Sequence, residues 1–495
     1  MKTNQLFVVL TICYVSLTAP ISRAADITAA ASGNWGDPGT WTGGVVPGTN
    51  DDADIPSGIT VTVTTNAGVQ YIYDAGTVTL SPNATLTITD PTGGTGTASL
   101  GTLNATASDC TVIYNCNPYW TKLCDYYNLV FDTSYWTPPT NQPPWLDFNN
   151  FSTFQGHVPM NIAGDMTLIG HVKVQQGTDD QNGLCDIFIG GKLIIGQGCA
   201  WDCSGANLTV ASNAYVYGKL LDGNGAIGSN YFGGNVLVLG PATPGRAYYQ
   251  PPFFVGDYTN GWFVSDVTQW AIGGSLTNNG YLGGGAGYGS IAFDGTGVIT
   301  GSNAMVIPTM TVNGTYAIGN TITLTTNTPG LNGTLVFDLV SSPTNVINFT
   351  LGGTNYLWYA GNLDVINSGA APVSGQTYQF FNSVNGLYNG NFNSVTLPPL
   401  GGGQSWVNHL LTSGSITVVG GGGGARPVIA YAINGNNLTL TWNTSGFPGF
   451  SVQVETNRLG VAGSNWVNAV NGTTSPFVTP IVRTNAPVFF RLFHP

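Results

Sequence analysis

Acidic residues and lysines that could act together on a polysaccharide lie within one part of the sequence. Carboxylates can hold calcium through oxygen ligands, and a lysine can be the base that takes a proton from a substrate. Polysaccharide lyases combine these groups on one face of a strand. The candidate residues are Asp165, Lys173, Asp186 and Lys192. Their clustering predicts where an active site would lie if the chain is an enzyme.

A seven-residue pattern repeats through the same region. Each copy has apolar residues at positions one, five and seven, a small residue at position three and a polar residue at position four. The copies are residues 162–168, 189–195 and 210–216, and residues 272–278 repeat the spacing but end on a polar residue. Because strand side chains alternate between two faces, we expect the four odd positions to share one buried face.

The composition also favours strands over helices. Charged residues make up 7% of the chain, against roughly 25% in an ordinary globular domain. There are 70 glycines, and no amphipathic stretch with helix caps follows residue 25. Short strands that recur every 20 to 35 residues or so, with turns between them, are typical of stacked β-coils. We therefore predict an all-β solenoid in which each coil buries its apolar face against the next.

The repeat offers a structural explanation for two of the charged candidates. Asp165 and Lys192 both occupy position four of a copy. In a solenoid they would be surface neighbours on adjacent coils, and an exposed ion pair contributes less than ~1 kcal/mol. We therefore expect no enzyme activity. A carbohydrate-active enzyme, either a polysaccharide lyase or a glycoside hydrolase, is the alternative.

Three aspartates near the start of the chain could bind calcium through oxygen ligands. They are Asp51, Asp52 and Asp54. A solvated turn explains the same residues, and we predict that explanation. The four histidines have no spacing that suggests a metal site. We therefore predict no cofactor, with calcium as the one possibility.

The first 24 residues have the features of a secretory signal peptide. Lys2 is followed by an apolar stretch over residues 6–19 and by Ser22-Arg23-Ala24, which resembles a cleavage site. No other segment is long and apolar enough to cross a membrane. The net charge of −12 excludes nucleic acid as a partner, since phosphates require clustered lysine and arginine. We expect a secreted or cell-surface protein whose partner is an extracellular polysaccharide or the cell envelope.

Six cysteines follow the predicted signal peptide. An even number in an exported chain favours disulfides, and six allow 15 connectivities. They fall into two groups of three, so either one bond links the groups or two thiols remain unpaired. The six are Cys110, Cys116, Cys124, Cys185, Cys199 and Cys203.

Two stretches rich in aromatic residues, near 117–156 and 241–270, read as insertions that project from the solenoid. The first also contains prolines, which central strands exclude. Exposed rings offer flat apolar faces that stack on sugars, so these loops are candidate glycan-binding sites. Alternatively, the rings fold back and cover the flank of the solenoid. The candidate ligand-binding residues are Trp120, Trp136, Trp145, Tyr249 and Trp262.

Both ends of the predicted solenoid resemble known families. Residues 35–63 contain a W-x-D-P-x-x-W run, a G-G-x-x-P turn, an aspartate pair and a T-V-T-V strand. This combination resembles the start of G8-type and autotransporter-type β-helices. Residues 375–418 contain G-Q-T-Y-Q-F-F, G-N-F-N-S-V-T-L-P-P, a tryptophan and G-S-I-T-V, and resemble the last coils of autotransporter-associated repeat proteins. The resemblance implies a right-handed parallel β-helix in a secreted, passenger-like bacterial protein.

The predicted organisation has four parts. Residues 1–24 are the signal peptide, 25–419 the parallel β-helix with its N-terminal cap, and 420–427 a glycine-rich linker. Residues 428–495 form a small β-sandwich-like module. The predicted function is that of a structural or adhesive surface protein.

Overall fold

The structure is a computed structural model of the whole chain, and its description applies to part of that chain. Backbone alone is described at 146–148, 175, 221 and 261–263. The described residues are 25–73, 75–89, 101–115, 122, 124–134, 146–148, 159–176, 185–203, 206–221, 229–239, 261–263, 269–283, 289–326, 328–420, 427–444, 448–456, 465–482 and 488–494.

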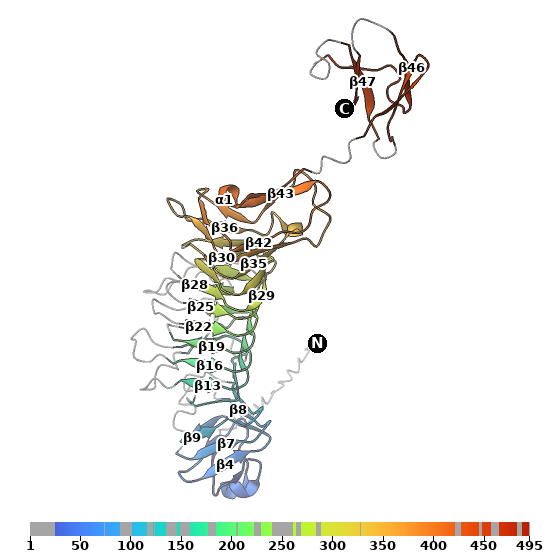
Figure 1. Cartoon of the computed structure of the whole chain (residues 1–495). Coiled ribbons are helices and arrows are strands. Elements are labelled where there is room, and N and C mark those ends of the chain that lie inside the picture. The colour runs from blue at the N-terminus through green and yellow to red at the C-terminus, as the bar shows by residue number, and fades with distance from the viewer. Residues whose placement is uncertain are drawn as a thin grey trace, which may run out of the picture. The chain divides into compact units, whose positions relative to one another are not determined.

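The fold is an all-β parallel solenoid followed by small antiparallel sheets, as the sequence predicts (Figure 1). Its longest sheet has 14 parallel strands. In chain order they are β5 (Asn66–Val69), β8 (Thr85–Ile88), β10 (Thr111–Tyr114), β11 (Asn128–Asp132), β14 (Met166–Ile169), β17 (Leu193–Ile195), β20 (Ala214–Val216), β23 (Val236–Val238), β26 (Leu276–Asn278), β29 (Thr296–Thr300), β32 (Thr315–Ile318), β35 (Thr334–Asp338), β38 (Asn362–Ile366) and β42 (Ser394–Thr396).

Two further parallel sheets form other sides of the coils. The eight-stranded sheet contains β13 (Met160–Ile162), β16 (Ile187–Ile189), β19 (Leu208–Val210), β22 (Ser229–Phe232), β25 (Gln269–Ile272), β28 (Ser290–Phe293), β31 (Thr309–Val312) and β34 (Gly330–Leu331). The six-stranded sheet contains β12 (Leu146–Phe148), β15 (Val172–Gln175), β18 (Ala200–Asp202), β21 (Lys219–Leu221), β24 (Gly261–Phe263) and β27 (Tyr281–Gly283). A middle coil therefore gives one strand to each sheet.

Shorter parallel sheets lie toward the two ends of the solenoid. Those near the start are β1 (Asp26–Thr28), β3 (Asp52–Asp54) and β6 (Tyr71–Tyr73), and β2 (Gly33–Asn34), β4 (Thr60–Val63), β7 (Thr77–Leu80) and β9 (Thr102–Asn104). Those near the end are β30 (Met305–Ile307), β33 (Ile322–Leu324), β36 (Ile347–Phe349) and β40 (Phe381–Ser383), and β37 (Leu357–Tyr359) and β41 (Tyr388–Gly390). The remaining elements up to residue 420 are η1 (Pro38–Thr40), η2 (Thr42–Gly44), η4 (Leu339–Ser341), β39 (Thr377–Gln379), β43 (Gln404–His409), α1 (Leu410–Ser413) and β44 (Ser415–Gly420).

The seven-residue repeat is not one strand, as the sequence pattern suggested, but two strands joined at a corner. In the first copy Ile162 ends β13 and Met166 begins β14, and the two strands belong to different sheets. The chain turns inward at the corner, so the apolar residues still face one core. The nine predicted core residues are all buried: Ile162, Met166, Leu168, Ile189, Leu193, Ile195, Val210, Ala214 and Val216.

The small residue at position three has a different role from the one expected. It lies at the corner, against the backbone of the preceding coil. A Cβ atom on Gly191 would lie 2.6 Å from the carbonyl carbon of Gly164, and one on Gly274 would lie 2.7 Å from that of Gly234. Real Cβ contacts are not this short, so the approach of the coils at Gly191 and Gly274 requires glycine, whereas Ser212 occupies the same position in the third copy.

Parts of the predicted aromatic insertions are strands of the solenoid. Phe148 lies in β12, and the register of β24 places Trp262 between Leu220 and Leu282, which are both buried. Trp270 lies in β25 and is buried, with its ring stacked on Phe232 at 5.5 Å between centroids. Aromatic residues that were predicted to project therefore continue the coils.

The last part of the chain forms two three-stranded antiparallel sheets. One contains β45 (Ala430–Asn434), β46 (Asn437–Thr441) and β49 (Phe477–Pro480), and the other contains β47 (Ser451–Glu455), β48 (Val467–Asn468) and β50 (Phe489–Phe493). The buried residues Leu440, Trp442, Val452 and Phe477 form its core. The chain divides into two compact units, and the second consists of Ala371–Gln376, Pro399–Val407 and Thr417–Pro495. It therefore contains these antiparallel sheets and parts of the end of the solenoid.

The predicted disulfides are not seen among the described cysteines. No disulfide joins any two of Cys110, Cys124, Cys185, Cys199 and Cys203, and Cys116 lies outside the described residues. Burial raises the pKa of Cys124, Cys185 and Cys199 to about 11 each. These thiols are therefore protonated at neutral pH, which makes them poor nucleophiles.

Within the described ranges no helix is long and apolar enough to span a membrane. The predicted signal peptide lies outside those ranges, as does most of the predicted glycine-rich linker.

The core can be tested with a pair of neighbouring isoleucines in β17. Ile195 is fully buried, whereas Ile194 faces outward and is half-buried. We expect Ile195→Asp to lower the free energy of unfolding by roughly 3–5 kcal/mol, the cost of an uncompensated buried charge. Ile194→Asp is the matched control and should cost far less. Urea unfolding measures both, and equal losses would contradict the assigned register.

Candidate functional site

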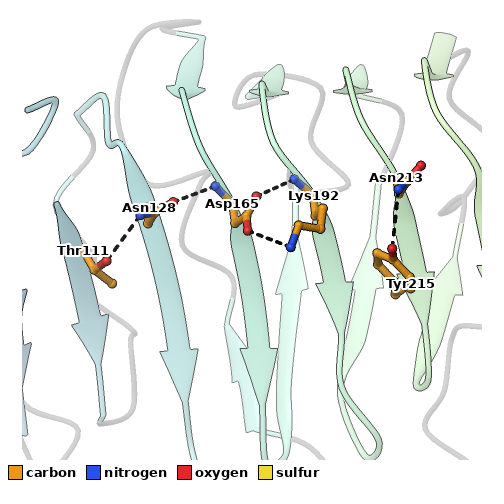
Figure 2. Close-up of polar contacts among 6 residues, drawn as sticks. All are labelled: Thr111, Asn128, Asp165, Lys192, Asn213 and Tyr215. Atoms are coloured by element: carbon orange, nitrogen blue, oxygen red, sulfur yellow. Dashed lines mark hydrogen bonds and ion pairs between the residues drawn. The ribbon is translucent and has the colours of Figure 1, made fainter. Parts of the chain in front are cut away.

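The polar residues at position four form a ladder of hydrogen bonds along one corner of the solenoid (Figure 2). The Asn128 Oδ1 accepts the Asp165 N–H at 2.8 Å, and the Asp165 Oδ1 accepts the Lys192 N–H at 2.7 Å. Further along, the Asn213 Oδ1 accepts the Asn235 N–H, and the Asn235 Oδ1 accepts the Ser275 N–H, both at 2.8 Å. Each of these four acceptors thus satisfies a backbone donor of the next coil. Lys192 has no acceptor atom in its side chain, so the ladder is interrupted before Asn213.

The Asp165–Lys192 pair is part of this corner ladder. Lys192 Nζ lies 3.5 Å from Asp165 Oδ2, and the two side chains are 47% and 38% exposed. Water and salt screen a pair this exposed, so it adds less than ~1 kcal/mol. Asp165 therefore acts mainly as a hydrogen-bond acceptor, a role that asparagine fills elsewhere in the same column.

The other two catalytic candidates lie at different positions around the coil. Lys173 in β15 pairs with Asp202 in β18 at 3.8 Å, and both side chains are largely buried, at 18% and 13% exposure. Asp186 precedes β16, where its Oδ1 accepts the Asn207 N–H at 2.9 Å. The four candidates thus do not form a single site. The sequence pattern did not identify Asp202. The register of β15 and β18 pairs Lys173 with Ala200, two residues before Asp202.

The candidate calcium ligands do not converge either, and two of them lie on a strand rather than in the predicted turn. Asp51 accepts the Gly48 N–H through Oδ2 at 3.0 Å and the Ala25 N–H through Oδ1 at 3.3 Å. Asp52 and Asp54 lie on β3, beside Tyr73, whose pKa burial and the nearby carboxylates raise to about 12. Over the described ranges no three acidic, histidine or cysteine residues gather as a metal site.

Most of the predicted ligand-binding rings cannot be placed. Trp120, Trp136, Trp145 and Tyr249 lie outside the described residues, and only the backbone is described at Trp262.

Exposed rings instead occur on the strands themselves, on the outer face of the eight-stranded sheet. One outward residue per coil forms what we call the outer column. In register order it contains Asn161, Phe188, Thr209, Tyr231, Ala271, Ala292, Thr311 and Gly330. Phe188 and Tyr231 are each 42% exposed.

The next coil adds Trp358 to this column. Thr334 pairs with Asn362, and the Thr328 hydroxyl donates to the Tyr356 carbonyl, so the offset between these coils is constant. From the same offset we infer that Trp358 lies beside Gly330, on a strand, β37, that pairs with β41 in a separate two-stranded sheet. Its neighbours Leu357 and Tyr359 are buried, and Trp358 is 48% exposed.

A second ring and an amide accompany Trp358. The ring of Tyr356 is 38% exposed and lies 6.4 Å from that of Trp358, edge to face. Asn389, an exposed residue of β41, pairs with Trp358 in register. The alternation of side chains along a strand could have identified these rings from the sequence. Phe188 and Trp358 each lie between two apolar residues of a short strand, so the middle residue faces outward when its neighbours face the core.

Comparison with family models, with curated proteins and with solved structures gives no match for this chain.

The corner ladder predicts how substitutions at position four affect stability. Asp165→Asn keeps the acceptor and should change the free energy of unfolding by less than about 0.5 kcal/mol. Asp165→Ala leaves the Lys192 N–H without its partner and should cost about 1 kcal/mol. Asn213→Ala, which removes an acceptor but no charge, should cost the same. Thermal unfolding measures all three. If Asp165→Asn were as damaging as Asp165→Ala, the charge rather than the ladder would matter.

Proposed function

We propose that this protein is an exported structural or adhesive element of the cell surface, which binds glycans through exposed aromatic side chains on the solenoid. The observation that carries the proposal is the set of exposed rings on the outer column, with Trp358 and Tyr356 at one end. Aromatic faces stack on the apolar faces of sugar rings, and exposed apolar patches mark interaction sites.

The surroundings of these rings suit a sugar. Thr209 lies between Phe188 and Tyr231 in the column, and Asn389 lies beside Trp358. Hydroxyl and amide groups can both donate and accept hydrogen bonds, as sugar hydroxyls require. A ring flanked by neutral polar groups is therefore a plausible platform for a glycan.

Contacts between coils account for the charged catalytic candidates. Asp165 and Asp186 each accept a backbone N–H from the next coil, and Lys173 has its own partner in Asp202. These residues have structural roles that explain their presence. The predicted signal peptide, the acidic composition and the resemblance to passenger-like β-helix proteins support an extracellular location, with a polysaccharide or the cell envelope as the partner.

The proposal is tested by binding to insoluble polysaccharides, with chitin, cellulose and peptidoglycan as probes. We expect the intact protein to bind at least one of them. Trp358→Ala combined with Tyr356→Ala should weaken that binding roughly tenfold or more, because each ring contributes about 1 kcal/mol.

Tyr217→Ala is the matched control, because Tyr217 is exposed at a corner next to the long sheet, away from the outer column. It should bind as the unmodified protein does. Absence of binding by the intact protein, or equal loss in all variants, would contradict glycan binding through these rings.

A further inference from the structure

We propose that the outer column holds an unbranched, uncharged polysaccharide in an extended form, lying parallel to the solenoid axis between Tyr231 and Trp358. This inference rests on the proposed function and specifies the ligand and its direction.

The sizes of the side chains along the column suggest a continuous path. Between the rings of Tyr231 and Trp358 every residue of the column is small: Ala271, Ala292, Thr311 and Gly330. These four have too few atoms to obstruct a chain that crosses the strands. The side chains along the path are thus short in the middle, and an aromatic ring lies at each end.

The length of the path is set by the strand spacing. Adjacent strands lie about 4.8 Å apart, and four paired steps separate Tyr231 from Gly330. With a fifth step of similar length to the coil of Trp358, the backbones of Tyr231 and Trp358 are about 24 Å apart. A sugar ring in an extended glycan advances by a length close to one strand spacing. A chain along the axis would therefore place about one sugar on each coil, and five or six sugars between the rings.

Rows of polar side chains flank the small residues on both sides. Gln269, Ser290 and Thr309 lie in register two residues before the column. On the other side Asn313 Nδ2 donates to Asp294 Oδ1 at 2.8 Å, and Asn332 Nδ2 donates to Asn313 Oδ1 at 3.1 Å. The coils of Ala292 and Thr311 therefore carry polar groups on both sides of the path, whereas the coil of Ala271 has Gly273 on the second side.

The charges of these rows favour a neutral ligand. Neither row contains lysine or arginine, and Asp294 is the acidic member. An acidic polysaccharide would be repelled by that carboxylate and by the net charge of −12. An extended peptide would need an open strand edge for its backbone, but β25, β28 and β31 are each paired on both sides. An uncharged glycan, including an N-acetylated one, is not repelled by the carboxylate and does not need an open strand edge.

The test measures affinity against chain length by calorimetry, with β-1,4-linked glucose and N-acetylglucosamine oligomers of two to eight sugars. We expect affinity for at least one series to rise at least tenfold between two and six sugars and then to level off. Ala292→Phe, in the middle of the small-residue path, should lower affinity for the hexamer at least tenfold. Thr311→Phe should do the same.

Ala317→Phe is the matched control, because Ala317 is a half-buried outward residue of β32 on the long sheet. It should bind normally, and thermal unfolding should show that all three variants are folded. If affinity levels off at two sugars and Ala292→Phe and Thr311→Phe bind normally, local stacking remains and the continuous path is wrong.

Two other outcomes would also overturn the inference. If the protein binds none of the neutral oligomers or polymers, the proposed function fails together with the path. If Trp358→Ala instead abolishes a concentration-dependent self-association in sedimentation, the occupant of the column is a second copy of the chain.

Discussion

The structure depends on the backbone hydrogen bonds that join each coil to the next. They hold equivalent residues of successive coils about 4.8 Å apart, so one residue type at a given position becomes a column along the solenoid. Inward columns are apolar and supply the core, which no single coil could bury alone. At the corners, small residues lie against the backbone of the coil before them, and side-chain acceptors bond the backbone N–H groups of the coil after them. The core, the corner ladder and the outer column all follow from the same repeat distance.

This repeat also changes how individual polar residues should be interpreted. Asp165 could be an acid, a calcium ligand or half of an ion pair. In the coil stack it accepts a backbone N–H from the next coil, as Asn128 and Asn213 do at the same position. A carboxylate that fills a position shared with asparagine is being used for its oxygen rather than for its charge. Charged residues in a solenoid are best compared with the residues above and below them before a chemical role is assigned.

Much of the fold could be predicted from the sequence, because burial in a strand leaves a period of two. That period identified the buried members of each copy, including Ile195 and Val216. It did not reveal the corner between Ile162 and Met166. A turn of three residues keeps the inward residues at odd positions of the repeat, just as one continuous strand would.

The candidate site was harder to predict. Phe188 and Trp358 are 170 residues apart in the sequence, and only the stacking of the coils brings them into one line. Aromatic density drew attention to the predicted insertions instead, where Trp270 proved to be a core residue.

The central claim is that the outer column, from Tyr231 on the eight-stranded sheet to Trp358 on the next coil, is one linear site whose period matches that of its ligand. A crystal structure of the protein with a neutral six-sugar oligosaccharide tests it most directly. The account predicts an extended chain that crosses the strands at a right angle over Ala271, Ala292 and Thr311, with about one sugar per coil and terminal sugars stacked on Tyr231 and Trp358. A chain bound along the strand direction, or on another face of the solenoid, would contradict it.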